Sequence, residues 1–529
     1  MAAIVQERHL ALGSRSYGES LVFLLTLASF GTFIYVAYSI FLSSLSKFPG
    51  PVWAKISPSW LVKQSRATRR TDAVMSLHRQ YGNFVRIAPN HISISVAQAA
   101  HEVYGHKSGF LKADFYDVFV QVKPGVFNTR EVEVHQRKRK FLNPAFSARA
   151  LREFEPHMDE EIRLWKSRML DMTTDTSAKV DFSIWSKYLS ESQGMVTEGI
   201  LIVGYTANYL AFDVIGSFSF GKPFGFIQKG YDAYGLIQTI DERGEFFNAL
   251  GSVPGFLRPF MKYYRFDPFW KRGAKAKANF EDFCRRAYLE RKHGDSCNRR
   301  DLLSYLLAAK DPDTGTPLPE EEIIAESISF VVGGSDTTSS TMTNFIDFVS
   351  RDKELLERIQ KELDTQYPGP LGPDWVADND TASTLLLLNS TLREVMRIRP
   401  TSATGLERVT PKGGRIIAGT FIPEGTIVSI PTQSVMQDAN IFPDPLRLLP
   451  ERWLDANSET LLRSFIPFSI GPRACIGRNF AWMEAVKGLA TVLRLFDLHR
   501  TIQAETEVRE GFFKKATECV VELSRRSKF

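Results

Sequence analysis

One long uncharged run lies close to the N-terminus. Leu21 to Leu42 is a stretch of 22 residues without a charged side chain, and a helix of that length, at about 1.5 Å per residue, crosses the core of a bilayer. Six basic residues and no acidic residue follow between Ser43 and Arg70, so the positive-inside rule places the rest of the chain in the cytosol. The run is longer than a typical signal-peptide core and no A-x-A site follows it, which favours an anchor over a cleaved signal.

The patterns after this run change from strand to helix and back. Apolar and polar residues alternate on both sides of a Pro-Asn turn in Asn83–Val96, which predicts a β-hairpin. Helical spacing dominates from Tyr104 to about residue 310, and again from Pro319 to about Asp364. Strand patterning returns at Arg415–Pro431, and ECVVELS near the C-terminus predicts a last strand. We therefore expect one large helix-rich domain with a minor β part on a membrane stalk.

Composition removes several classes of protein. The chain is 43% hydrophobic and 24% charged, which is typical of globular proteins. Its net charge of +6 is weaker than the excess that nucleic-acid binders carry, so no nucleic acid is expected, and acidic partners or an anionic membrane are favoured. Only 4 cysteines occur in 529 residues, too few for a disulfide framework, and they indicate a reducing compartment.

One of these cysteines stands in an unusual setting, the stretch PFSIGPRACIGRNFAWMEA. Cys475 directly precedes an amphipathic helix, whose first amide N–H groups would stabilise a thiolate. Four flanking residues suit a flat ligand, because glycines permit a close backbone approach, an arginine pairs with a carboxylate and a phenylalanine shields the sulfur: Gly471, Gly477, Arg473 and Phe468. By itself the stretch indicates an activated thiolate, which a nucleophile, a redox switch or a metal ligand would all use.

A second motif lies in a helical run, SFVVGGSDTTSSTM. Gly333 and Gly334 each cost about 1 kcal/mol against alanine inside a helix. They mark a helix C-terminus, a packing notch, or space left for a ligand. Asp336 and Thr337 follow directly and provide an acid and an alcohol.

Two further groups of charged residues have ordinary explanations. Glu394 and Arg397 are spaced i,i+3 on a helix, which usually means a surface salt bridge. The basic stretch VHQRKRKFLNPAFS, Val134–Ser147, is typical of a solvated helix face.

Taken together, these motifs change the interpretation. Phe468-x-x-Gly471-x-Arg473-x-Cys475-x-Gly477 resembles the haem-ligand loop of the cytochrome P450 superfamily, and GGSDTT resembles its oxygen-activation motif. The resemblance implies a mainly α fold with a small β part, in which haem b lies between a long central helix and the cysteine loop. Cys475 is then the axial ligand of the haem iron.

The same resemblance assigns roles residue by residue. Asp336 and Thr337 would deliver protons during oxygen activation. A buried structural network near the cysteine loop would consist of Glu394, Arg397 and Arg452. Besides Arg473, the expected contacts to the haem propionates are His135, which stands where the family has tryptophan, Arg139, and Arg408, which follows Glu407 where the family commonly has proline. A basic face for an acidic electron donor would be formed by Arg137, Lys138 and Lys140.

A finer likeness concerns the substrate. YGHKSGFLKADFYDVFVQVKPGVFNTR, NYLAFDVIGSFSFGKPFG and REGFFKK resemble the fungal microsomal subgroup that includes benzoate para-hydroxylases. By family position the substrate pocket would be lined by Phe115, Phe119, Phe330, Gly334, Thr404, Leu406 and Phe512. These side chains predict an apolar or aromatic substrate. Because the sequence indicates no carboxylate partner in the pocket, secondary metabolism is favoured over benzoate-type 4-hydroxylation in catabolism.

The function implied is a monooxygenase that uses O2 and electrons from NADPH. No GxGxxG follows a strand, so the electrons would come from a separate NADPH-cytochrome P450 reductase, with cytochrome b5 as a further partner. The expected location is the endoplasmic reticulum membrane, with a single pass and these parts: a lumenal N-terminus 1–20, an anchor 21–42, a proline-rich elbow 43–52 and a cytosolic catalytic domain 53–529. A reductase-independent isomerase or dehydratase and a non-catalytic haem sensor are the alternatives, and the intact acid–alcohol pair disfavours both.

Overall fold

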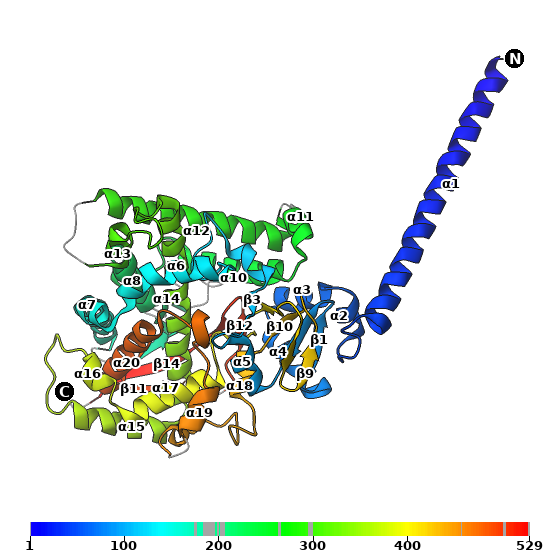
Figure 1. Cartoon of the computed structure of the whole chain (residues 1–529). Coiled ribbons are helices and arrows are strands. Elements are labelled where there is room, and N and C mark those ends of the chain that lie inside the picture. The colour runs from blue at the N-terminus through cyan, green and yellow to red at the C-terminus, as the bar shows by residue number, and fades with distance from the viewer. Residues whose placement is uncertain are drawn as a thin grey trace.

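The computed structural model shows a helical body beside a smaller β region, and one long helix, α1 (Ala2–Ala37), projects from the β side (Figure 1). The structure describes residues 2–173, 177–183, 196–197, 200–201, 207–262, 266–294, 300–455, 458–500 and 504–526. Part of the predicted helical stretch, at 184–195, lies outside the described residues. The predicted architecture, mainly α with a small β part, is confirmed.

The body is built around two helices. α8 (Ala207–Phe220) is buried along its whole length and packs beside α14 (Glu320–Val349). The predicted helical run is confirmed, but it is two helices, because Asp352 caps a new helix by accepting a hydrogen bond from the Leu355 N–H. The other helices are α2 (Val52–Ile56), α3 (Ser59–Arg66), α4 (Arg70–Tyr81), α5 (Ala97–Tyr104), α6 (Val132–Leu142), α7 (Ala148–Met172), α9 (Phe226–Lys229), α10 (Leu236–Gly251), α11 (Arg258–Lys262), α12 (Pro268–His293), α13 (Leu302–Ala308), α15 (Lys353–Gln366), α16 (Asn379–Ala382), α17 (Leu386–Ile398), α18 (Thr432–Met436), α19 (Ser458–Ser464) and α20 (Arg478–Leu495).

Small sheets make up the β part. The largest has the order β1-β2-β10-β7-β3, and in it β2 and β10 run parallel while the other neighbours are antiparallel. The predicted hairpin is its β1–β2 pair, and the predicted last strand is β14. The strands are β1 (Phe84–Ala88), β2 (His91–Ile94), β3 (Leu111–Lys112), β4 (Ala178–Asp181), β5 (Val196–Thr197), β6 (Ile200–Leu201), β7 (Arg408–Val409), β8 (Arg415–Ile417), β9 (Thr420–Ile422), β10 (Ile427–Ser429), β11 (Phe496–Arg500), β12 (Val508–Glu510), β13 (Lys514–Ala516) and β14 (Val520–Arg525).

The projecting helix carries exposed apolar side chains along its outer part. Phe23 and Phe33 are 67% and 69% exposed, and Tyr17–Leu42 is long and apolar enough to cross a membrane. Its end is held by the β region, because Arg86 donates from Nη1 to the Ser39 carbonyl at 2.8 Å. The Arg86 N–H also bonds the Pro49 carbonyl at 2.8 Å, so the segment after the helix is fixed to the edge of β1.

Candidate functional site

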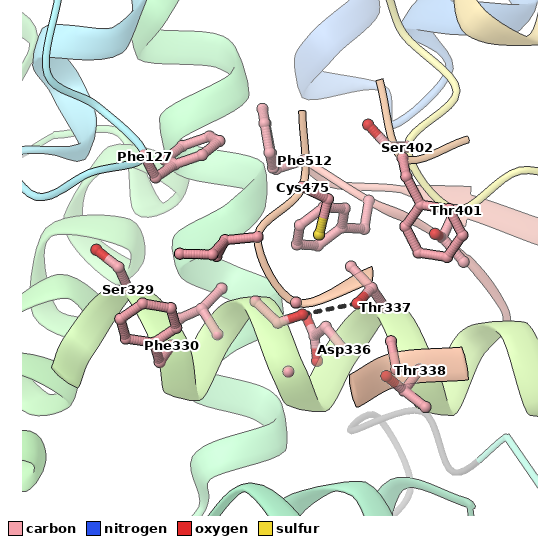
Figure 2. A pocket seen from close by; sticks show the side chains of 18 of the residues that line it. Phe127, Ser329, Phe330, Asp336, Thr337, Thr338, Thr401, Ser402, Cys475 and Phe512 are labelled. Atoms are coloured by element: carbon pink, nitrogen blue, oxygen red, sulfur yellow. Dashed lines mark hydrogen bonds between the residues drawn. The ribbon is translucent and has the colours of Figure 1, made fainter. Parts of the chain in front are cut away.

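A cavity of about 320 Å³ lies inside the body, between α14, α10, the segment before α20 and the β12–β13 hairpin. Figure 2 shows Phe127, Phe330 and Phe512 around the same space as Cys475 and Thr337. Five of the residues predicted to form a substrate pocket line this cavity: Phe119, Phe330, Gly334, Leu406 and Phe512. The cavity is therefore bordered by both motifs that the sequence analysis singled out.

Two predicted pocket residues, Phe115 and Thr404, lie outside the lining. The ring of Phe115 packs on the backbone of α10, where a Cβ added to Gly251 would lie 2.3 Å from it. Thr404 is buried beside Gly405. A Cβ added to Gly405 would lie 2.8 Å from the Ile430 backbone nitrogen, so the chain passes close to Ile430 at this point. Phe115 packs against Phe119 and Phe512, which do line the cavity, but the structure includes neither Phe115 nor Thr404 in the lining predicted for them.

The cysteine loop holds its sulfur at the cavity. The Cys475 N–H bonds the Phe468 carbonyl at 2.9 Å, and the Cys475 side chain is exposed to the cavity while protein surrounds it on its other sides. Gly471 has a φ of +71°, and an added Cβ would lie 2.2 Å from the Tyr104 carbonyl oxygen, so only glycine fits there. Gly477 directly precedes α20 and also lines the cavity.

The electrostatics of this loop argue against a free nucleophile. Burial raises the pKa of Cys475, although a hydrogen bond from the Gly477 N–H and the charge of Arg139 oppose the shift. The loop thus holds a protonated thiol until something replaces the proton. A metal ion does so, because coordination deprotonates a thiol outright.

Several basic residues gather on one side of the cavity. Arg473, Arg139, His135 and Lys112 line it, while Arg408 lies just behind, donating to the Tyr116 hydroxyl at 3.1 Å. Arg473 donates to the backbone carbonyls of Thr129, Arg130 and Glu131.

The positive charges in this group repel one another and lower one another's pKa values. Burial, followed by the charges of Arg473 and Lys112, lowers the pKa of His135 to about 3. Within the described parts of the chain, none of the five makes an ion pair with a carboxylate. A ligand with two carboxylates would offset this repulsion, so the residues present fit the propionates of the predicted haem.

Sequence analysis missed Lys112. It occupies β3, is 6% exposed, and hydrogen-bonds the Phe127 carbonyl; burial and the nearby arginines lower its pKa well below the usual value. A lysine inside the apolar stretch GFLKADFY was the available signal, because a buried lysine needs a partner.

The predicted basic face on α6 is corrected by the structure. Arg137 pairs with Glu322 through two hydrogen bonds of 2.8 Å, and Lys138 is buried against Glu322 and Glu326. Only Lys140 of the three is exposed. The two inward residues tie α6 to α14 because the acidic first turn of α14 faces them.

Another pair of arginines lies beside the cysteine loop instead. The guanidinium of Arg393 stacks over Trp482 at 5.2 Å, and that of Arg478 over Phe468 at 5.6 Å. Burial and the charge of Arg478 lower the pKa of Arg393, so the two charges lie close together.

The helix α14 runs unbroken through its two glycines, so the interpretation as a helix C-terminus is wrong. A Cβ on Gly334 would lie 2.4 Å from Ile215 Cδ1 of α8, whereas a Cβ on Gly333 would meet nothing within 4 Å. Gly334 is therefore a packing notch, and Gly333 leaves space at the cavity. Thr337 donates its hydroxyl to the Gly333 carbonyl at 2.7 Å (Figure 2).

Asp336 belongs to a buried charge cluster that only the tertiary structure assembles. Its Oδ1 lies 2.8 Å from Lys515 Nζ, and the same Nζ lies 2.5 Å from Asp241 Oδ1. Burial raises the pKa of Asp336 to about 6; Lys515 opposes this shift and Asp241 adds to it. Together with Arg243 and the ion pair between Arg509 and Glu245 (2.7 Å), these groups form what we call the charged wall: Asp241, Arg243, Glu245, Asp336, Arg509 and Lys515.

The predicted network around Glu394 is present. Arg397 donates to both carboxylate oxygens of Glu394, at 2.8 and 2.9 Å, and Arg452 donates at 2.9 Å. The Trp453 indole and the Leu449 N–H complete the set. Glu394 and Arg397 are fully buried, so this is a structural network rather than a surface salt bridge.

Comparison with known proteins covers most of the chain. A family model described as Cytochrome P450 matches residues 49–519. The benzoate 4-monooxygenase bphA of Aspergillus niger is 35% identical over 509 residues, which cover 91% of this chain and 93% of that protein. The cytochrome P450 monooxygenases ORF11 of Penicillium roqueforti and astJ of Aspergillus oryzae are 30% and 29% identical, covering 86% and 88% of this chain and 89% and 88% of their own lengths.

Proposed function

The chain belongs to the cytochrome P450 family and is a haem-thiolate monooxygenase, and from this premise we propose that the Cys475 thiolate would hold the haem iron. The bound haem supplies the activation of O2 and the oxidising power of the reaction. Phe468, Gly471 and Gly477 hold the sulfur at the cavity through the loop geometry described above. The observation that carries the proposal is a thiol that is open to the cavity within that loop.

The cation cluster would bind the haem propionates. Arg473, Arg139 and Lys112 line the cavity and have charge to offer, His135 lines it as well, and Arg408 acts through the Tyr116 hydroxyl. The low pKa of His135 makes its ring a neutral hydrogen-bond donor rather than a cation.

Asp336 and Thr337 would carry protons to the oxygen-binding side of the cavity. A carboxyl group with a pKa of about 6 gains and loses a proton readily near neutral pH, as a general acid must. Thr337 has a hydroxyl at the cavity, held by the Gly333 carbonyl. Because both groups are present, oxygen activation is favoured over a reductase-independent isomerase or dehydratase, and over a sensor.

We propose a small apolar or aromatic substrate, because phenylalanines and aliphatic side chains form much of the lining. An aromatic-acid hydroxylase is the second candidate, and the 35% identity with a benzoate 4-monooxygenase favours it. The preference for secondary metabolism depended on a pocket without a carboxylate partner, and Arg243 in the charged wall removes that basis.

Electrons would come from a separate NADPH-cytochrome P450 reductase, with cytochrome b5 as a further donor. Arg393 and Arg478 beside the cysteine loop give an acidic partner a docking point there. We propose that 21–42 anchors the protein in the endoplasmic reticulum membrane, that 1–20 is lumenal, and that 43–52 links the anchor to the cytosolic catalytic domain 53–529.

The haem ligand is tested by the spectrum of the reduced, CO-bound protein. The wild type should give the thiolate-type Soret band, and Cys475→Ala should lose it. Cys284→Ala is the matched control, because Cys284 is buried in the core away from the cavity and the band should stay. A thiolate band in Cys475→Ala would contradict the assignment. Incorporation of isotopically labelled O2 into product, dependent on reductase and NADPH, tests the monooxygenase step.

A further inference from the structure

Arg243 is a buried cation in the charged wall without a carboxylate partner. It lies on α10, is 5% exposed, and lines the cavity. In the parts of the chain that the structure describes, it forms no ion pair, and its Nε has no hydrogen-bond partner. Its guanidinium lies over two aromatic rings instead, 4.6 Å from the centroid of Phe247 and 5.1 Å from that of Phe280. Burial lowers the pKa of Arg243 only to about 10, so it remains charged at neutral pH.

The neighbouring carboxylates already have other partners. Glu245 pairs with Arg509 at 2.7 Å, and Asp241 and Asp336 both pair with Lys515. Asp336 acts on Arg243 only through its more distant charge, which raises the pKa of the arginine. Each of the other two cations of the wall is in contact with an acid, whereas Arg243 presents five N–H donors without one.

Stacking on two rings compensates such a charge only in part. Cation–π contacts favour the guanidinium position but leave its N–H donors unbonded, and an unbonded charged group under a protein surface is strongly unfavourable. The Nε has no acceptor within the described chain, and the side chain borders an open cavity. A ligand that brings an anionic group into the cavity would supply the missing acceptors, because a carboxylate matches the guanidinium fork with two hydrogen bonds.

The rest of the cavity restricts the body of that ligand. Phe127, Phe330 and Phe512 surround the space, with Ile215 and Ile240 on the adjoining helices. An apolar or aromatic body fits these side chains. Arg243 is also adjacent to the Phe512 side, since a Cβ on the next residue, Gly244, would lie 3.4 Å from the Phe512 backbone nitrogen.

We propose that this cavity takes a small carboxylate with an apolar or aromatic body, and that Arg243 binds its carboxylate. The proposal rests on the monooxygenase function above and names the substrate class of the same site. Arg243 is then the specificity residue that distinguishes an acid from its neutral analogue.

The test uses the full-length holoenzyme and matched pairs of acid and amide: benzoate with benzamide, cinnamate with cinnamamide, and hexanoate with hexanamide. Dissociation constants are measured by the ligand-induced shift of the haem spectrum and, independently of the haem, by calorimetry. The wild type should bind at least one acid more tightly than its amide. Arg243→Gln should weaken that acid by about 10- to 100-fold, the range of one charge-assisted contact, while changing the amide less than about threefold.

Two variants control this comparison. Arg243→Lys keeps the charge and should retain part of the preference for the acid. Arg286→Gln removes the same charge from the surface of α12, where Arg286 pairs with Asp282, and should leave both constants unchanged.

Two results would overturn the proposal: wild type that binds no acid more tightly than its amide, or Arg243→Gln that weakens acid and amide equally, as a residue needed only for packing would. Failure of the proposed function has a different signature, loss of the thiolate-type CO band in the wild type itself, and calorimetry of the acid–amide pairs still decides the role of Arg243 in that case.

Discussion

The polar side chains on the two sides of the cavity differ in how completely they are hydrogen-bonded and ion-paired. On the cysteine side, the Glu394 carboxylate accepts five hydrogen bonds and Arg473 donates to three backbone carbonyls. On the charged wall, two carboxylates share Lys515, and Arg243 has no acid in contact among the described residues. A polar side chain whose hydrogen bonds are all made is held in one geometry. A side chain that shares its partner, or has none, can exchange a proton or bind a ligand. The fully bonded Glu394 network therefore supplies rigidity beside the cysteine loop, whereas the charged wall is suited to proton exchange and ligand binding.

The sharpest way to separate the two sides is Asp336→Asn. If Asp336 delivers protons, turnover should fall by about 10²- to 10⁴-fold, the usual contribution of a positioned acid or base. The CO-bound spectrum should keep its thiolate band, because the cysteine side is untouched. Turnover is measured as the rate of product formation per enzyme, and NADPH consumption is followed in parallel. Unchanged coupling of NADPH to product would show that the charged wall does not supply protons.

Removing a charge from the Glu394 network should lower the free energy of unfolding. Glu394→Gln removes the charge between the buried Arg397 and the half-buried Arg452, and the loss of one member of such a buried network costs about 3–5 kcal/mol. Urea unfolding of the holoprotein measures this cost. Glu153→Gln, in the exposed pair with Arg149, is the control and should change little. Equal midpoints for the two variants would refute the structural role of the network.

The two glycines of α14 differ in how much space surrounds them. Gly334→Ala places a Cβ 2.4 Å from Ile215 Cδ1 and should destabilise the fold by about 1–3 kcal/mol. Gly333→Ala faces open space, so it should be neutral or stabilising by up to about 1 kcal/mol. Thermal unfolding of both variants without substrate measures the difference. A Gly333→Ala variant less stable than Gly334→Ala would show that Ile215 does not restrict this position of α14.

The smallest effect concerns pH. Lys515 lowers the pKa of Asp336, which burial and Asp241 raise to about 6, above its unfolded value. A carboxyl group whose pKa is higher in the folded than in the unfolded protein destabilises the fold as the pH rises from the unfolded pKa to the folded pKa. Lys515→Met should raise this pKa further, so the stability deficit against wild type should grow between about pH 6 and 8. Melting temperatures across that range measure it. Lys515→Arg keeps the charge and should follow the wild type, and a pH-independent deficit in Lys515→Met would contradict the action of Lys515 on the pKa of Asp336.

Much of the fold was predictable because its signals are local. Alternation around Pro89–Asn90 predicted the β1–β2 hairpin, and helical spacing predicted the region of α14 and α15. The break between these helices was not predicted, because one capping aspartate, Asp352, is a weaker sequence signal than the long helical periodicity on both sides of it. The basic face assigned to α6 was wrong for a related reason: sequence spacing cannot tell whether a cation faces solvent or an acidic turn of another helix.

The cysteine loop and the Glu394–Arg397 pair were predictable from the sequence, because Phe468 to Gly477 are contiguous and Glu394 and Arg397 are one helical turn apart, so short-range geometry brings each group together. The charged wall is assembled by the tertiary fold alone. Asp241, Asp336 and Lys515 come from α10, α14 and β13, far apart in the chain, and no spacing rule relates them. Arg243 likewise looks like any helical arginine in the sequence, and only burial at the cavity without an acid in contact makes it a candidate for binding substrate.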